Sequence, residues 1–235
     1  QRALALYAHM QADISHHAAD PAVREKADDM VGLLTPIVKA SGTDMGSEIT
    51  NMCLQVYGGH GYIKEWGMEQ MVRDVRITQI YEGTNTIQAL DLIGRKLGIA
   101  GGRLFKGFVA ETDAMLARLK GRNDLAEFVA PFKDARDKLV AATQWITEQS
   151  AKDANLRGAV ANDYLRMFAL TTMAWMWVEM ADRAITKKDA SDPFYEGKLH
   201  TARFFMAKVL PQIAAHDGLI RTGSTPAMAV PESFF

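Results

Sequence analysis

Apolar side chains recur every three or four positions along most of the chain, which is the spacing of one face of an α-helix. Few stretches alternate strictly between apolar and polar residues, as a half-buried strand does. The pattern therefore predicts an all-α protein. In the first half we expect helices over 1–17, 20–40, 43–57 and 84–97.

The second and third of these helices are delimited by local signals. Asp20 followed by Pro21 predicts an N-cap and a proline at the first helical position. Pro36 predicts a kink or break inside the pattern, and Ser41–Gly42 predicts its end. The next helix, 43–57, is expected to bury one apolar side, made of Ile49, Met52, Cys53 and Val56.

The second half has the same helical spacing over four longer stretches, at 104–119, 125–146, 160–185 and 194–213. The third stretch is apolar nearly all round, which predicts a central helix covered on every side. Its methionine and aromatic residues leave open a pocket for a hydrophobic ligand. Core packing is the preferred interpretation, because methionine fills irregular gaps well.

These elements predict two helical bundles in sequence. Residues 1–98 form the first bundle, and a glycine-rich stretch, 98–102, links it to a second, up-and-down bundle over 99–218. The remaining residues, 219–235, contain two prolines and are expected to form an extended tail.

Composition narrows the possible partners. The 235 residues are 48% hydrophobic and carry a formal net charge of −1, which favours neither nucleic acid nor an anionic membrane surface. No apolar run approaches the ~20 residues of a membrane span. The single cysteine, Cys53, excludes an internal disulfide and indicates a reducing compartment such as the cytoplasm. No His, Cys and Asp cluster has the spacing of metal ligands. The chain lacks both an initiator methionine and a signal peptide, so we expect a fragment of a longer protein.

The chemistry is expected between Gln55 and Asp91, and above all at Glu82. Three glycines, Gly58, Gly59 and Gly61, interrupt the helical pattern where the backbone must bend or approach something closely. Further on, the hexapeptide Ile-Tyr-Glu-Gly-Thr-Asn places the Glu82 carboxylate between two apolar residues and a flexible polar segment. Arg73 with Asp74, and Arg76, between these two motifs, are predicted to be a surface face of ion pairs.

A carboxylate removes a proton from carbon when it is held close to that proton and partly stripped of water. Ile80 and Tyr81 supply an apolar wall for Glu82, and Gly83 leaves room for a ligand. Thr84 is predicted to cap the next helix, so that free amide groups near Glu82 face whatever binds there. From the residues alone, an ordinary loop acid near a helix N-terminus is the preferred interpretation of Glu82.

The stretch QVYGGHGYIKEWGMEQMVRDVRITQIYEGTNTIQ resembles the C-terminal signature of the acyl-CoA dehydrogenases over more than thirty consecutive positions. These flavoenzymes oxidise an acyl-CoA thioester to the trans-2-enoyl-CoA. The resemblance implies that Glu82 is the catalytic base, which takes the α-proton while a hydride leaves the β-carbon for N5 of FAD. It also implies that the backbone N–H of Glu82 donates to the thioester carbonyl.

The same resemblance implies roles for eight further residues. Tyr81 and Gly83 lie beside the substrate, and Thr84 and Asn85 reach the FAD of their own subunit. A second set lies against the flavin dinucleotide that the neighbouring subunit mainly binds: Gln55, Val56, Gly58 and Gly59.

The resemblance further implies a homodimer, fatty-acid β-oxidation as the setting, and an electron-transfer flavoprotein as the electron acceptor. Residues 99–218 resemble the additional helical domain of larger bacterial acyl-CoA dehydrogenases, including those that act on 3-methylthiopropionyl-CoA. The flavin-cradling domains of the family have no counterpart here, so the isolated chain is expected to be inactive. The alternative is a non-catalytic dimerisation or interaction module derived from the family.

Overall fold

The computed structural model describes residues 1–187 and 192–234, and every regular element within these ranges is helical. This confirms the predicted all-α class. The α-helices are α1 (Arg2–His17), α2 (Pro21–Tyr57), α3 (Gly59–Tyr62), α4 (Met68–Arg76), α5 (Asn85–Gly94), α6 (Arg103–Arg118), α7 (Ala126–Gln149), α8 (Leu156–Thr186), α9 (Pro193–Phe204), α10 (Ile213–Arg221) and α11 (Thr225–Met228). Short 3₁₀ segments occupy Lys64–Trp66, Ile77–Gln79, Lys96–Gly101, Asn123–Leu125, Leu210–Gln212 and Glu232–Phe234, and a π-helical segment occupies Phe205–Val209.

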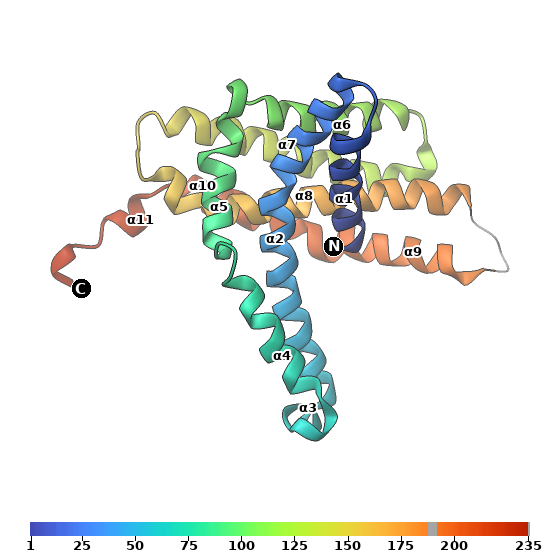
Figure 1. Cartoon of the computed structure of the whole chain (residues 1–235), viewed down its shortest axis with the longest axis horizontal. Helices are drawn as coiled ribbons and strands as arrows, with labels where there is room; N and C mark the ends of the chain where they lie inside the picture. The colour runs from blue at the N-terminus through green and yellow to red at the C-terminus, as the bar shows by residue number, and fades with distance from the viewer. Residues whose placement is uncertain (188–191, 235) are drawn as a thin grey trace.

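The molecule consists of a helical body from which a narrow arm projects (Figure 1). The arm, defined here as residues 46–80, comprises the C-terminal third of α2, then α3, then α4, which returns alongside α2. All the other long helices lie in the body. The predicted site is therefore carried by an outgrowth and its root rather than by the middle of a bundle.

The arm exists because α2 runs without interruption for 37 residues, about 55 Å. The prediction of a break at Pro36 and an end at Ser41–Gly42 was wrong. A proline inside a helix costs about 3 kcal/mol. Burying one Leu or Ile side chain recovers roughly 1.5–3 kcal/mol, and this part of α2 buries four large ones, Leu33, Leu34, Ile37 and Met30. Tertiary packing therefore holds the helix continuous.

The start of α2 follows the sequence signal. The Asp20 carboxylate accepts a hydrogen bond from the backbone N–H of Ala22 at 2.8 Å, and Pro21 occupies the first helical position. The cap satisfies one of the free N–H groups of the first turn.

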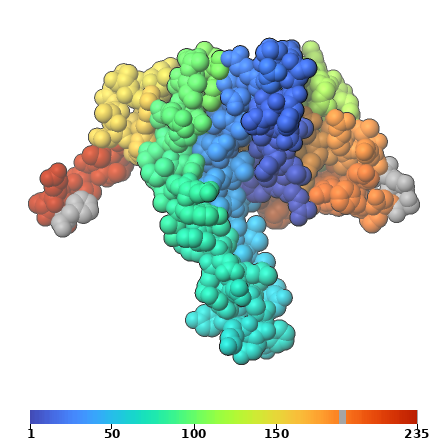
Figure 2. Space-filling view, viewed as in Figure 1, coloured from blue at the N-terminus to red at the C-terminus, as the bar shows by residue number. Residues whose placement is uncertain are grey.

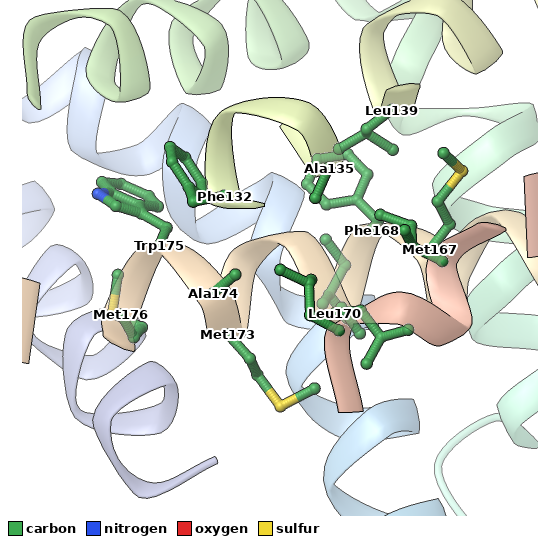
Figure 3. Packing of buried hydrophobic residues seen from close by; sticks show 14 of the residues in the cluster. Phe132, Ala135, Leu139, Met167, Phe168, Leu170, Met173, Ala174, Trp175 and Met176 are labelled. Carbon is green, nitrogen blue, oxygen red and sulfur yellow. The ribbon is translucent and has the colours of Figure 1, made fainter. Parts of the chain in front are cut away.

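The core of the body is built around α8, as the apolar pattern predicted. Phe168 is completely buried and contacts the rings of Phe105, Phe108 and Tyr164. Figure 3 shows Phe132 of α7 on the same side of α8 as Trp175, whereas Met173 and Met176 point to the opposite side. Buried residues from both halves of the sequence belong to this one cluster, from Leu4 of α1 to Ile220 of α10.

One polar pair is enclosed in this core. The hydroxyls of Tyr164 and Thr143 lie 2.7 Å apart, and both side chains are buried. Burial raises the pKa of Tyr164, so its hydroxyl keeps its proton for the hydrogen bond.

The C-terminal residues differ from the extended tail that was predicted from residue 219. Helix α10 continues to Arg221, and α11 adds one further helical turn. Ser224 is buried and donates a hydrogen bond to the Asp153 carboxylate at 2.5 Å, which ties this segment to the α7–α8 connection. Phe235, at the end of the predicted tail, lies outside the described residues.

Candidate active site

The arm projects from the body (Figure 2), and many of its exposed side chains are large and apolar. The predicted burial of Cys53 and its neighbours was wrong, because α2 extends beyond the body and meets few partners there. Val56 is 86% exposed, and Cys53 is exposed as well. The exposed large apolar side chains of the arm are Ile49, Met52, Val56, Tyr57, Tyr62, Ile63, Trp66, Met71, Ile77 and Ile80.

The glycine cluster forms the tip of the arm, and its members have different roles. Gly58 ends α2 with φ +60° and ψ −143°, a conformation that L side chains rarely adopt. Gly61 is buried, and a Cβ at this position would overlap the carbonyl oxygen of Leu54 and come within 2.8 Å of the Tyr57 Cβ. A Cβ on Gly59 would meet nothing within 4 Å. Packing within the chain therefore explains Gly61 but not Gly59.

The predicted flavin-contacting residues at this tip all lie at the surface. Gln55 and Val56 are exposed on the last turn of α2, and Gly58 and Gly59 are exposed where α2 passes into α3. They form one continuous stretch of accessible backbone and side chain.

Glu82 lies at the root of the arm, in the connection to α5. Its backbone has φ +52°, one of two positive values among the described non-glycine residues, and Gly83 follows with φ +81°. The Gln88 side chain donates to the Glu82 carbonyl at 3.0 Å. Among the described residues, none accepts a hydrogen bond from the backbone N–H groups of Glu82 and Gly83, and none pairs with the exposed Glu82 carboxylate. Two donors and one acid are therefore available on the same short segment.

Helix α5 begins where it was predicted to begin. Thr84 is the N-cap, and its hydroxyl accepts from the backbone N–H of Ile87 at 3.4 Å, a long hydrogen bond. Tyr81, on the other side of Glu82, is half exposed, as is Ile80. The apolar wall of Glu82 is present but not covered by this chain.

A polar cluster under the Glu82 loop was missed from the sequence. Lys39 of α2 donates to the carbonyl of Gly83 and to Oδ1 of Asn85, both at 2.8 Å. Nδ2 of Asn85 donates to Asp44 Oδ1 at 2.6 Å and to Thr43 Oγ1 at 2.9 Å. The signal in the sequence was the spacing of Lys39 and Thr43, which puts them one turn apart on the same helix face. Only the docking of the loop on that face reveals their partners.

The two predicted groups of cofactor residues are not brought together within one chain. Asn85 bonds to Thr43, and Gln55 lies twelve residues further along the same continuous helix. At 1.5 Å per residue, about 18 Å of α2 separates the tip group from the Glu82 loop.

The charged face of α4 differs in one pairing from the prediction. Arg73 forms its ion pair with Glu69, one helical turn away at 2.7 Å, rather than with Asp74. Arg76 donates to the Gln79 side chain at 3.1 Å. Both arginines are exposed, and their contacts are those of an ordinary helix surface.

Two other features bear on the class of site. Over residues 1–187 and 192–234, no three His, Cys, Asp or Glu side chains gather as they would around a metal ion. Among the described helices, none combines the length and the hydropathy that crossing a membrane requires.

Two family models together match nearly all of the chain, and both describe the C-terminal region of a dehydrogenase. The model "Acyl-CoA dehydrogenase, C-terminal domain" matches residues 2–98, and "Acetyl-CoA dehydrogenase C-terminal like" matches residues 108–231. The chain belongs to the acyl-CoA dehydrogenase family, as the resemblance predicted.

Two bacterial relatives extend over almost the whole chain. It is 33% identical over 243 aligned positions to a butyryl-CoA dehydrogenase of Syntrophomonas wolfei, an alignment that covers all of this chain. It is 31% identical over 230 positions to the 3-methylmercaptopropionyl-CoA dehydrogenase of Ruegeria pomeroyi, covering 95% of this chain. In both cases the chain spans 39% of the relative's length.

The fold is similar to that of an acyl-CoA dehydrogenase from Bacillus anthracis whose crystal structure was determined with FAD. The TM-score is 0.64 at 17% identity, and the match covers 93% of this chain and 46% of the other. An identity this low establishes the common fold alone.

Proposed function

We propose that this chain supplies the catalytic base and part of the flavin-binding surface of an FAD-dependent acyl-CoA dehydrogenase, which converts an acyl-CoA thioester into the trans-2-enoyl-CoA. The observation that supports this most directly is the left-handed segment at Glu82–Gly83. It presents an unpartnered carboxylate beside unpartnered backbone donors, in a chain that belongs to this family.

Glu82 acts as the general base. Its carboxylate accepts the proton from the carbon next to the thioester carbonyl, and the free N–H of Glu82 donates to the oxygen of that carbonyl. This hydrogen bond stabilises the negative charge that develops on the oxygen as the proton leaves. When bound, FAD supplies the two-electron oxidant that accepts the β-hydride.

The residues present fit a dinucleotide at two places. At the root of the arm, Thr84 and the backbone N–H of Asn85 lie at the start of α5, where first-turn amides favour a polar or anionic group. At the tip, Gln55, Val56 and Gly58 are exposed, and Gly59 has open space where a side chain would stand. A ligand that approaches the backbone closely would account for that glycine.

Tyr81 and Gly83 line the substrate side of Glu82. Tyr81 is 50% exposed and offers an apolar and aromatic surface beside the carboxylate. Gly83 is held by the bond from Lys39 to its carbonyl, and its missing side chain keeps the approach to Glu82 open. A bound acyl chain against Tyr81 would remove water from the base.

The geometry of the arm supports the proposal of a homodimer. The tip and the root of one arm lie about 18 Å apart along α2, so we propose that the tip serves the cofactor of a second subunit. The exposed apolar side chains of the arm are suited to burial in such an assembly. We further propose an electron-transfer flavoprotein as the electron acceptor and fatty-acid β-oxidation in a bacterial cytoplasm as the setting.

The test is an anaerobic flavin-bleaching assay on the complete protein purified with FAD, against a series of acyl-CoA thioesters. A matched Glu82→Gln variant keeps the shape of the side chain and removes its basicity. We expect bleaching by at least one thioester, and a rate in the variant that is lower by roughly 10²–10⁴-fold. Flavin content and thioester binding should be unchanged, because the carboxylate has no partner that holds the fold together.

Two results would contradict the proposal. Activity that survives in Glu82→Gln would exclude Glu82 as the base. A protein that retains FAD but is bleached by no thioester would favour the non-catalytic interaction module.

A further inference from the structure

We propose that Lys39 and Asp44 are positioning residues that hold the Glu82 loop in its left-handed conformation. This inference rests on the proposed function of Glu82 as a base and adds the device that fixes its place. The two side chains lie little more than one turn apart on α2, and the loop docks against that turn.

Lys39 holds the loop directly behind the base. Its ammonium donates to the carbonyl of Gly83, the residue after Glu82, and to the side-chain oxygen of Asn85. A backbone with φ +52° at Glu82 and +81° at Gly83 is disfavoured for the first residue and persists only where its surroundings fix it. The hydrogen bond from Lys39 holds the carbonyl of Gly83, which lies between these two residues and α5.

Asn85 is the middle of the arrangement, because both polar atoms of its side-chain amide form hydrogen bonds within the chain. Its oxygen accepts from Lys39, and its nitrogen lies within hydrogen-bond distance of Thr43, Asp44 and the carbonyl of Ala40. The two N–H groups of the side-chain amide therefore have no capacity left for an additional strong bond to a ligand. A hydrogen bond that Asn85 donates to a cofactor would come from its backbone N–H.

Asp44 fixes both ends of the loop at once. Its Oδ1 accepts from Asn85 after the base and from Gln79 before it, at 2.6 and 2.7 Å. Its other oxygen lies 4.0 Å from the guanidinium of Arg166 of α8, and both side chains line a cavity of about 150 Å³ that His216 also lines. The Asp44 carboxylate thus contacts the segments before and after Glu82 and also faces α8 of the body.

The test compares Lys39→Met with wild type in the complete, flavin-loaded protein. Methionine keeps an unbranched side chain of nearly the same length and removes both hydrogen bonds. Because small misplacements of a catalytic group have large effects, we expect kcat to fall by about 10²-fold. We expect KM for the thioester to stay within about threefold, since no substrate contact is removed. Lys39→Arg, which keeps the charge and the donors, should recover kcat to within about tenfold of wild type.

A second measurement does not depend on activity. Amide hydrogen exchange over residues 79–88 should become at least about tenfold faster in Lys39→Met, while exchange in α8 stays unchanged. Lys138→Met is the matched control, because Lys138 makes only a surface pair with Asp134 at 2.6 Å. Should Lys39→Met fail to fold, Asp44→Asn keeps the shape of the side chain and weakens the bonds that Gln79 and Asn85 donate to it, and a drop in kcat of about tenfold is expected.

The outcomes separate the two proposals. If the wild type oxidises no thioester, the proposed function fails, and faster exchange in Lys39→Met still supports the positioning role. If the wild type is active and Lys39→Met matches it in kcat and in exchange, the positioning role is overturned while Glu82 remains the base. A loss of kcat that Lys39→Arg does not recover at all would also overturn it.

Discussion

The arm and the body follow the same sequence pattern and bury their side chains very differently. In the body, the apolar face of each helix meets another helix, and residues such as Phe168 are completely enclosed. In the arm, the same spacing produces regular helices whose apolar residues stay exposed, and Met68 is the one buried large side chain among residues 46–80. Apolar periodicity therefore specifies the helix and its face, but not what covers that face.

The largest expected effect belongs to the core of the body. Phe168→Ala should lower the free energy of unfolding by about 3–5 kcal/mol, because it removes a ring packed against three others. Trp66→Ala is the counterpart in the arm, where the ring is 56% exposed and packs edge to face on the ring of His60. We expect it to cost no more than about 1 kcal/mol. Urea unfolding followed by far-UV circular dichroism measures both, and equal losses would contradict the comparison.

A smaller effect is expected at the tip of the arm, where one residue is tightly packed. Gly61→Ala forces a methyl group against the Leu54 carbonyl and Tyr57, so we expect a local cost of about 1–3 kcal/mol. Limited trypsin digestion should then cleave faster after Lys64, which lies just beyond α3.

Gly59→Ala is the control for this substitution. It adds the same methyl group two residues away, where nothing lies within 4 Å. Cleavage after Lys64 should stay at the wild-type rate. Identical cleavage of the two variants would mean that the packing of α3 does not stabilise the tip.

The smallest effect on stability is expected at Val56. Val56→Ser changes a side chain that is 86% exposed, so the free energy of unfolding should stay within about 0.5 kcal/mol of wild type. In the complete protein the same change should weaken self-association, which light scattering across a dilution series measures. A variant that is less stable but associates normally would place Val56 in a fold contact that this structure lacks.

The sequence predicted the fold better than it predicted the arm. The apolar stretch 160–185 identified α8 as the central helix, and Asp20 and Thr84 marked two helix starts that the structure confirms. The continuity of α2 was missed, because a local rule for Pro36 cannot include the burial of Leu33, Leu34 and Ile37 on its flanks. The exposure of Cys53 was missed for the opposite reason, since an apolar neighbourhood in sequence was taken for one in space.

At the site, the sequence indicated Glu82 as the candidate base and the glycines around it. The residues that support Glu82 could not be predicted, because Lys39 and Asp44 lie more than 35 positions from their partners in the loop, Gly83 and Asn85. The sequence around a helical lysine does not indicate which carbonyl its ammonium will bind in the folded chain. The roles of the tip residues remain predictions, because they concern contacts outside this chain.

Because Cys53 is exposed, a label attached to it can report on the surroundings of the arm. Cys53 is the single cysteine of these 235 residues, and it lies on the third of α2 that leaves the body. A maleimide fluorophore attached there would report polarity and tumbling at the arm without altering any residue of the body. Its emission colour and anisotropy would register the moment at which another surface closes over that helix.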